Sequence, residues 1–416
     1  MAALALAPAV WCARQFAELW WFGDDWGLLD EINRTGFWRW VLQPFAENFV
    51  PLFKVLWGGL VFGGGGVYWP MIAALWLTHA LNTALFARLL RTAGFGLMAT
   101  SFAAIVFALT SYNIETLAWS VQWSALLAIT FFLLAAPILV RRINAGLPIG
   151  WPTLAALSLL SAGSALAFSR GVLTGGALAA ISLLPLGPAP RSWLERLRIA
   201  AACLLPAVAV MVTIMMVSPG NLRSLGGHIP AVVEFALTNW AVTPFHGLLA
   251  SETWHRPYAI VLGALKLTMI LSVLRSATSG QRVLLLLVLV LDLGNAVLLG
   301  IGRHHTGITS ANGSRYYYNS LLCTLPFVGL ALSAWLRPLP TPRIRVMVAA
   351  GLALLIMWHV TRGWPDVAGN YAAYRGRNTR ELLLRNPNPP AEKAVPGIDF
   401  LPTKRAKELI EIYHLH

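Results

Sequence analysis

The sequence predicts an all-α protein, a polytopic bundle of about 10–11 transmembrane helices with interfacial helices in its first outer loop. Hydrophobic residues make up 57% of the 416 residues and charged residues only 12%, whereas about a quarter of the residues in a soluble domain are charged. Apolar windows of about twenty residues recur along the chain, and each can cross a hydrocarbon core of about 30 Å. The three cysteines lie far apart in apolar stretches, which favours buried free thiols over disulfides or a metal site.

The apolar segments predict where the chain crosses the membrane. The first of them is the weakest, because Arg14 and Glu18 interrupt it. Four glycines, 63–66, should break the chain between an interfacial helix at about 50–62 and the second span, since glycine is disfavoured inside helices. The predicted spans are 1–22, 67–90, 97–112, 117–140, 152–169, 171–188, 199–218, 257–275, 283–301, 317–336 and 346–361.

Arginine clusters occupy every second connection between these spans, so all of them fall on one side of the membrane. The positive-inside rule makes that side cytoplasmic, and the net charge of +14 therefore indicates topology and no nucleic-acid partner. The first outer loop (about 23–51) and a C-terminal tail (362–416) then lie on the non-cytoplasmic side, with 1–361 as the transmembrane domain. In a bacterial host the membrane would be the inner (plasma) membrane. The clusters are Arg88 and Arg91, Arg141 and Arg142, Arg191, Arg196 and Arg198, Arg275 and Arg282, and Arg337, Arg343 and Arg345.

Acidic residues on the non-cytoplasmic side are the first candidates for chemistry. Asp24 and Asp25 stand next to Trp26 in the first outer loop, where tryptophans mixed with charges predict interfacial helices at 26–32 and 37–42. One interpretation is that an aspartate caps the helix that opens at Trp26. The other is catalytic, because a partly desolvated carboxylate beside a like charge has a raised pKa. Glu115 lies in a short outer turn, and a carboxylate at the end of a span is often functional.

Several short motifs resemble the GT-C superfamily of membrane glycosyltransferases, especially its O-mannosyltransferase-like branch. Most of the matching residues lie before residue 140, with one later point near Arg315. The motifs are Phe22-Gly23-Asp24-Asp25-Trp26, Gly36-Phe37-Trp38, Gln43-Pro44-Phe45, Val50-Pro51-Leu52, His79-Ala80-Leu81-Asn82, Glu115-Thr116-Leu117-Ala118-Trp119 and Ser314-Arg315-Tyr316.

The resemblance implies a glycosyltransferase that moves a sugar from a polyprenyl-phosphate donor to an acceptor on the non-cytoplasmic face. Asp24 or Asp25 would be the general base or would help to hold a divalent cation; no other cofactor is implied. Lipids and the lipid-linked sugar would be the partners. Asp24, Asp25 and Glu115 are accordingly the expected catalytic residues.

A lipid-phosphate leaving group would need a cation at the outer interface. Arg170, Arg303 and Arg315 are the candidates, because a guanidinium matches phosphate with paired donors; each is also placed to extend toward lipid headgroups instead. Arg170 lies between two spans with little loop around it, so it needs a partner, for which Glu115 is one candidate. His304 and His305 join the expected substrate-binding residues; their spacing indicates no particular metal site.

A second hypothesis belongs to another class of protein. The chain would be a non-catalytic integral subunit of a larger membrane complex, built on a GT-C-like scaffold, and a protein partner would order the proline-rich tail. A secondary transporter ranks last, since no repeat-related pair of broken helices is visible.

Overall fold

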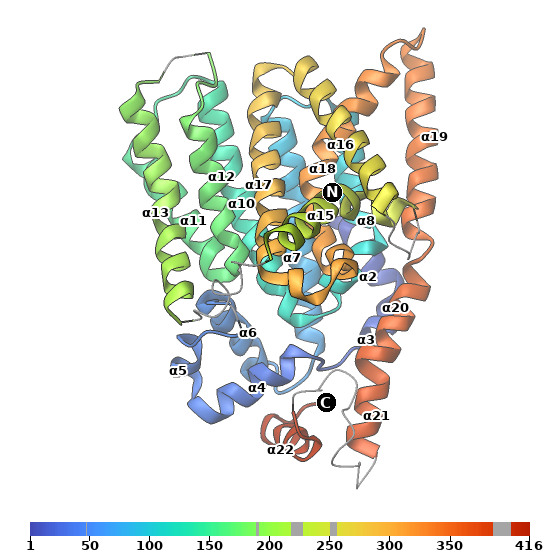
Figure 1. The fold of residues 1–416 in the computed structure, drawn as a ribbon. Coiled ribbons are helices and arrows are strands. Elements are labelled where there is room, and N and C mark those ends of the chain that lie inside the picture. Colours follow the sequence, from blue (N-terminus) through green and yellow to red (C-terminus); the bar gives the residue numbers. More distant parts are fainter. Residues whose placement is uncertain (47, 189–190, 218–227, 250–255, 386–400) are drawn as a thin grey trace.

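The apolar segments fold into a bundle of helices (Figure 1) in the computed structural model, which describes residues 1–46, 48–188, 191–217, 228–249, 256–385 and 401–416. No strand occurs within these ranges. The first half of the chain forms α1 (Ala2–Ala5), α2 (Ala7–Trp11), α3 (Ala13–Ala17), α4 (Asp24–Thr35), α5 (Phe37–Val41), α6 (Pro51–Gly63), α7 (Trp69–Thr92), α8 (Leu97–Leu109), η1 (Ser111–Asn113), α9 (Ile114–Leu117), η2 (Ser120–Gln122), α10 (Trp123–Asn144), α11 (Trp151–Ala167), η3 (Ser169–Gly171), α12 (Val172–Leu183) and α13 (Trp193–Val217). The second half forms α15 (Ile229–Leu249), α16 (Arg256–Ser276), α17 (Ser279–Arg303), η5 (His304–Thr306), η6 (Ile308–Asn312), η7 (Ser314–Tyr316), α18 (Tyr317–Leu336), α19 (Pro342–Thr361), α20 (Trp364–Ala372), η8 (Ala373–Arg377), α21 (Asn378–Arg385) and α22 (Thr403–Tyr413).

Six helical segments in the described part of the chain are long and apolar enough to cross a membrane, and a bent pair adds a seventh if it counts as one span. This confirms the polytopic helical bundle. The sequence predicted about 10–11 spans, and fewer segments are long enough to cross a membrane. The reason is that some apolar helices are short: α11 has 17 residues and α12 has 12. The six segments are Trp69–Thr92, Ser120–Asn144, Trp193–Met216, Pro257–Ser276, Ser279–Thr306 and Ser314–Leu336, and the bent pair is Leu97–Leu109 with Ser111–Leu117.

The predicted first span, 1–22, is not one continuous helix. It forms the three short helices α1, α2 and α3, whose C-cap residues are Leu6, Cys12 and Glu18. Pro8 lies in the first turn of α2, where its missing N–H breaks the backbone hydrogen-bond ladder of a longer helix. The break at 63–66 is confirmed, since α6 ends at Gly63 and α7 starts at Trp69.

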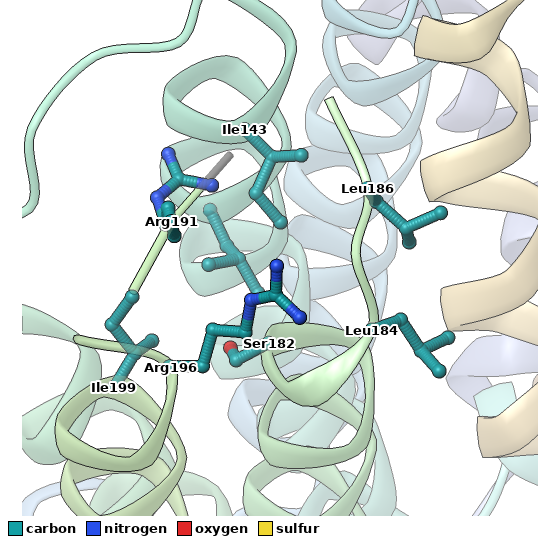
Figure 2. Close-up of a pocket in the computed structure, with 8 residues that line it drawn as sticks. Ile143, Ser182, Leu184, Leu186, Arg191, Arg196 and Ile199 are labelled. Atoms are coloured by element: carbon teal, nitrogen blue, oxygen red, sulfur yellow. The ribbon is translucent and has the colours of Figure 1, made fainter. Parts of the chain in front are cut away.

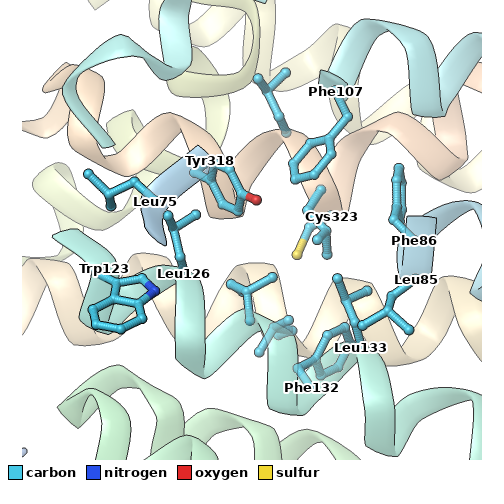
Figure 3. Close-up of a cluster of buried hydrophobic side chains, with 14 of the residues drawn as sticks. Leu75, Leu85, Phe86, Phe107, Trp123, Leu126, Phe132, Leu133, Tyr318 and Cys323 are labelled. Carbon is cyan, nitrogen blue, oxygen red and sulfur yellow. The ribbon is translucent and has the colours of Figure 1, made fainter. Parts of the chain in front are cut away.

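The centre of the bundle is held by side chains from α7, α8, α10 and α18. Figure 3 shows Phe86, Phe107, Phe132 and Cys323 among the buried side chains of this cluster. All three cysteines are buried and free, as expected. His79 lies at the edge of the cluster and contacts the hydroxyl of Tyr318 at 3.1 Å and the carbonyl oxygen of Ala108 at 3.1 Å, which gives it a packing function between helices.

Both α4–α6 and the C-terminal helix α22 lie at the lower end of the bundle in Figure 1, which we call the loop end. Arg405 of α22 donates to Asp30 of α4 at 2.7 Å, and the Tyr413 hydroxyl donates to the Leu29 carbonyl at 3.2 Å. Gly66, with φ at +80°, lies so close that a Cβ there would meet the Tyr413 carbonyl oxygen at 2.2 Å. The tail therefore packs on the chain's own first loop. Residues 386–400, which make up most of the proline-rich stretch, lie outside the described residues.

Candidate functional site

A cavity of about 480 Å³ opens at the loop end and collects four of the residues expected from the sequence. Asp24 comes from the start of α4, Arg170 from η3, Arg303 from the end of α17 and Arg315 from η7. These elements are far apart in sequence and meet because the bundle brings their loop ends together. The other lining residues are Phe45, Ala46, Asn48, Val50, Phe53, Trp119, Val121, Gln122, Ser124, Phe168, Ser169, Met211, Ile214, Met215, Leu298, Leu299, Ile301, Gly302 and Tyr316.

The cavity has a cationic part and an apolar part. The three arginines and Asp24 leave a formal excess of positive charge among its charged lining residues. The lower part of α13 supplies Met211, Ile214 and Met215, and α17 supplies Leu298 and Leu299, so one wall is made of aliphatic and thioether side chains. A ligand that fits both parts carries an anionic head and a hydrocarbon chain.

Asp25 is completely buried and does not line the cavity. Its carboxylate accepts hydrogen bonds from the Phe22 backbone N–H at 3.1 Å, from the Tyr68 hydroxyl at 3.3 Å and from the Ser120 hydroxyl. Burial raises the pKa of Asp25 to about 7, against the lowering effect of the hydrogen bonds from Ser120 and Phe22. The side chain thus ties α4 to α7 and η2.

Asp24 is the member of the pair that faces the cavity. It is the first residue of α4 and is half-buried. The N-cap is Gly23, with φ at +58°, and no side chain caps the helix. The capping interpretation is therefore wrong for both aspartates, which lie in the first turn of α4.

Arg170 is held by polar and aromatic neighbours. Its Nη1 donates to the Asn295 side-chain oxygen at 2.8 Å, and its guanidinium carbon lies 4.8 Å from the Phe168 ring centre and 5.6 Å from that of Tyr316. Burial lowers the pKa of Arg170 to about 10, which leaves it cationic at neutral pH. Its partner is Asn295 of α17, so the expected pairing of Arg170 with Glu115 is not observed.

Glu115 lies beside the cavity and holds the turn that carries Arg315. The Ser314 hydroxyl and the Arg315 backbone N–H, at 3.0 Å, both donate to one Glu115 oxygen. The other oxygen forms an ion pair with Arg375 at 3.2 Å. Glu115 does not itself line the cavity, so its carboxylate acts on the site through this turn.

Arg303 ends α17, and the two histidines that follow it point elsewhere. His304 Nδ1 contacts the Gly300 and Ile301 carbonyl oxygens at 3.1 and 3.3 Å, and His305 is exposed. Neither histidine lines the cavity. No group of three or more histidine, cysteine or acidic side chains placed to hold a metal ion occurs within the described ranges.

Arg191 and Arg196 line a small hollow (Figure 2), which lies where α12 ends and α13 begins, at the end of the bundle away from α4–α6 (Figure 1). Its free volume is only about 10 Å³, about enough for one water molecule. This hollow is too small for an organic ligand, whereas the cavity at the loop end has the volume of an ordinary ligand pocket.

Sequence reasoning missed Tyr68 and Ser120, which bind Asp25, and it missed Arg375. Nothing in the local sequence connects the first two to an aspartate more than forty residues away. The sequence did contain a reason to examine Arg375. An arginine expected on the side opposite the basic clusters is an exception to the positive-inside rule and would be stabilised by an acidic partner.

No known protein-family model matches the chain, and no curated protein does. Three solved structures of oligosaccharyltransferase from Archaeoglobus fulgidus are similar. The Archaeoglobus fulgidus oligosaccharyltransferase in the apo form is 12% identical, with a TM-score of 0.50, over 96% of this chain and 60% of that one. Its form tethered with an acceptor peptide containing the NVT sequon is 14% identical, with a TM-score of 0.48, over 99% and 59%. The AglB complex with an inhibitory peptide and a dolichol-phosphate is 13% identical, with a TM-score of 0.44, over 96% and 61%.

The likeness to the apo oligosaccharyltransferase shows the fold of the chain. At 12% identity it extends no further. The chain spans about three fifths of the length of the solved chains that it matches. The chain therefore has a GT-C-like membrane fold that is distantly similar to the fold of this oligosaccharyltransferase, as the sequence motifs predicted.

Proposed function

We propose that this protein is an integral membrane glycosyltransferase that moves a sugar from a polyprenyl-phosphate donor to an acceptor hydroxyl. The observation that carries the proposal is the cavity shared by Asp24 and three arginines beside an apolar wall. A guanidinium binds phosphate through paired, charge-assisted donors. An aliphatic wall suits a hydrocarbon chain, so the cavity fits both parts of a lipid phosphate.

The chemistry requires charge stabilisation on one side of the sugar and a proton acceptor on the other. The acceptor oxygen forms a bond to the anomeric carbon while the bond from that carbon to the phosphate oxygen breaks. Negative charge then builds up on the leaving phosphate, where Arg170, Arg303 and Arg315 stabilise it. Asp24 takes the proton from the attacking hydroxyl. Such a single displacement inverts the configuration of the anomeric carbon.

The two aspartates have different functions in this proposal. Asp24 is the general base, because it is the carboxylate that lines the cavity. Asp25 is a positioning residue, because its carboxylate is occupied by three donors and lies behind the wall. The carboxylate of Asp24 also admits a divalent cation as an additional ligand, which titration with Mg²⁺ or Mn²⁺ would detect.

The site faces the non-cytoplasmic side in this proposal. The Arg141 and Arg142 pair lies in the last turn of α10, and Arg191, Arg196 and Arg198 lie around the start of α13. Both of these helix ends are at the end of the bundle away from α4–α6 (Figure 1). The positive-inside rule places that end in the cytoplasm. Cysteine labelling from each side of the membrane, at Thr306 near the cavity and at Ser192 near the basic cluster, tests this orientation.

The competing hypothesis, a non-catalytic subunit of a larger complex, requires a protein partner for the C-terminal tail. The described tail helices contact the chain itself: Arg375 pairs with Glu115, Arg377 with Glu18 and Arg405 with Asp30. These contacts attach η8 and α22 to the rest of the chain itself. Native purification distinguishes the two hypotheses, since a stoichiometric partner retained in mild detergent would favour the subunit.

The experiment that tests the proposed function is transfer from a panel of polyprenyl-phosphate sugars by the purified protein in lipid vesicles. D24N is the test variant, because it keeps the shape of the side chain and removes the base. Transfer by the wild type and its loss in D24N would agree with the proposal. Transfer by D24N at the wild-type rate would remove Asp24 from the mechanism.

A further inference from the structure

Arg375 is a buried cation that neither the sequence motifs nor the proposed chemistry uses. It comes from η8, beyond the last apolar helix, and is 7% exposed. Its guanidinium carbon lies 4.9 Å from the Phe22 ring centre, 4.8 Å from that of Trp119 and 4.6 Å from that of Tyr371. Three aromatic rings thus enclose the charge directly behind Trp119, which is part of the cavity wall.

The hydrogen bonding of this guanidinium is incomplete. Nη2 forms the ion pair with Glu115, while Nε and Nη1 have no hydrogen-bond partner among the described residues. A buried cation that leaves donors unpaired is costly for folding. A buried charge with this cost is better explained by its effect on the site than by a gain in stability.

Glu115 connects this cation to the cavity. One carboxylate oxygen binds Arg375, and the other accepts from the Ser314 hydroxyl and the Arg315 backbone N–H. The chain of contacts runs from the tail, through one carboxylate, to the backbone of a residue whose side chain lines the cavity. Arg375 itself does not line the cavity, so it does not contact the ligand.

We propose that Arg375 is a positioning residue: it holds the Glu115 carboxylate against the Ser314–Arg315 turn and thereby sets the place of the Arg315 guanidinium in the cavity. The inference rests on the proposed function, because it assigns Arg315 to the phosphate. Beyond the proposed function, the inference assigns to η8, which follows the apolar helix α19, a part in positioning a residue of the binding site.

The backbone around Arg375 lies very close to the end of α3. Residues Ala373–Arg377 form a single turn of π-helix between α20 and α21, a local distortion that often occurs at functional sites. A Cβ at Gly376 would meet the Glu18 carbonyl oxygen at 1.8 Å, so only glycine fits where the tail meets that residue. G376A therefore displaces the segment without changing its charge, and G369A, where a Cβ would meet no atom within 4 Å, is the matched control.

The test is a double-mutant cycle on the affinity for farnesyl phosphate, measured by titration of the detergent-solubilised full chain. R375M should weaken binding about tenfold, which corresponds to about 1.4 kcal/mol. In an R315M background the same change should have almost no further effect, because Arg375 acts through Arg315. R375K should restore part of the affinity, and R380M, at an exposed position of α21, should bind like the wild type.

The outcomes separate this inference from the proposed function. The inference is overturned if R375M lowers the affinity by the same factor in the wild-type and R315M backgrounds, because Arg375 would then act independently of Arg315. It is also overturned if R375M binds farnesyl phosphate with wild-type affinity. R315M with wild-type affinity overturns the proposed function as well. If R375M does not yield monodisperse protein, the same cycle is run with E115Q, which removes the ion pair but keeps one side-chain oxygen to accept from Ser314 and Arg315. Affinity in E115Q that equals the wild type then contradicts the inference.

Discussion

Asp24 and Asp25 are neighbours in the chain, yet Asp24 lines the cavity and Asp25 is completely buried behind it. Successive residues of an α-helix point about 100° apart, so only one of the two can face a given side. The rotation of α4 is set by Tyr68 and Ser120, which hold Asp25. The pair therefore combines one carboxylate for chemistry with one that orients it.

The first prediction concerns Asp24. D24N should abolish sugar transfer and, at the same time, bind farnesyl phosphate at least as tightly as the wild type, because a negative charge leaves a cavity that holds a phosphate. Transfer kinetics and a binding titration of one preparation check both parts. A D24N variant that loses binding and transfer together would indicate a damaged cavity rather than a missing base.

The second prediction concerns the stability conferred by Asp25. D25A leaves the Phe22 N–H and the Tyr68 and Ser120 hydroxyls without this acceptor, and a buried unpaired donor costs about 1–3 kcal/mol. The Tm of D25A in detergent should fall well below that of D25N, whose amide oxygen still accepts. Equal Tm values for D25A and D25N would show that these hydrogen bonds contribute little.

The pKa of Asp25 gives a third prediction. It is about 7 in the folded protein and about 4 in an unfolded chain, so between these values the folded state holds a proton that the unfolded state has released. Stability should therefore fall as the pH rises from about 4 to about 7. D25N cannot ionise and should show a flatter profile. Thermal unfolding across this range checks it; parallel profiles for both proteins would contradict the raised pKa.

The fourth prediction concerns the apolar wall. L298W should fill part of the space along the apolar wall and weaken binding of farnesyl phosphate, while competition by inorganic phosphate should change little. The reason is that Leu298 lines the apolar part of the cavity and carries no charge. Competition titrations with both probes check it. An equal loss for both probes would mean that the wall supports the arginines rather than a lipid chain.

The fifth prediction concerns Lys54, a buried residue of α6. Its ammonium group donates to the Trp40 and Gln43 carbonyl oxygens, both at 3.0 Å, and so holds the segment before Phe45 and Asn48, which line the cavity. K54M removes both charged hydrogen bonds and should destabilise the protein by about 2 kcal/mol or more. Unfolding in denaturant measures this. A stability equal to that of the wild type would show that the segment is held by other contacts.

Much of the fold could be predicted because hydropathy and charge act locally. Apolar segments long enough to cross a membrane, and clusters of arginines in alternate connections, require no knowledge of tertiary contacts. The same alternation placed Asp24, Arg170, Arg303 and Arg315 at one end of the bundle, where the structure brings them to one cavity.

The rest depends on contacts between distant segments. Arg170 pairs with Asn295 rather than Glu115 because α12, which follows η3, packs against α17, and no local pattern reveals this packing. The pairing of Glu115 with Arg375 joins residues 260 positions apart. The helix breaks within residues 1–22 have two causes, a proline at position 8 and the packing of this segment against α7 and α8. Only the proline can be recognised in the sequence.

The most direct test of the central claim is the affinity of the purified protein for farnesyl phosphate, compared among the wild type, R170M, R303M and R315M. Binding by the wild type that each substitution weakens about tenfold or more would place the phosphate among the three guanidinium groups. Wild-type affinity in all three variants would contradict the account, because the phosphate would then bind outside this cavity.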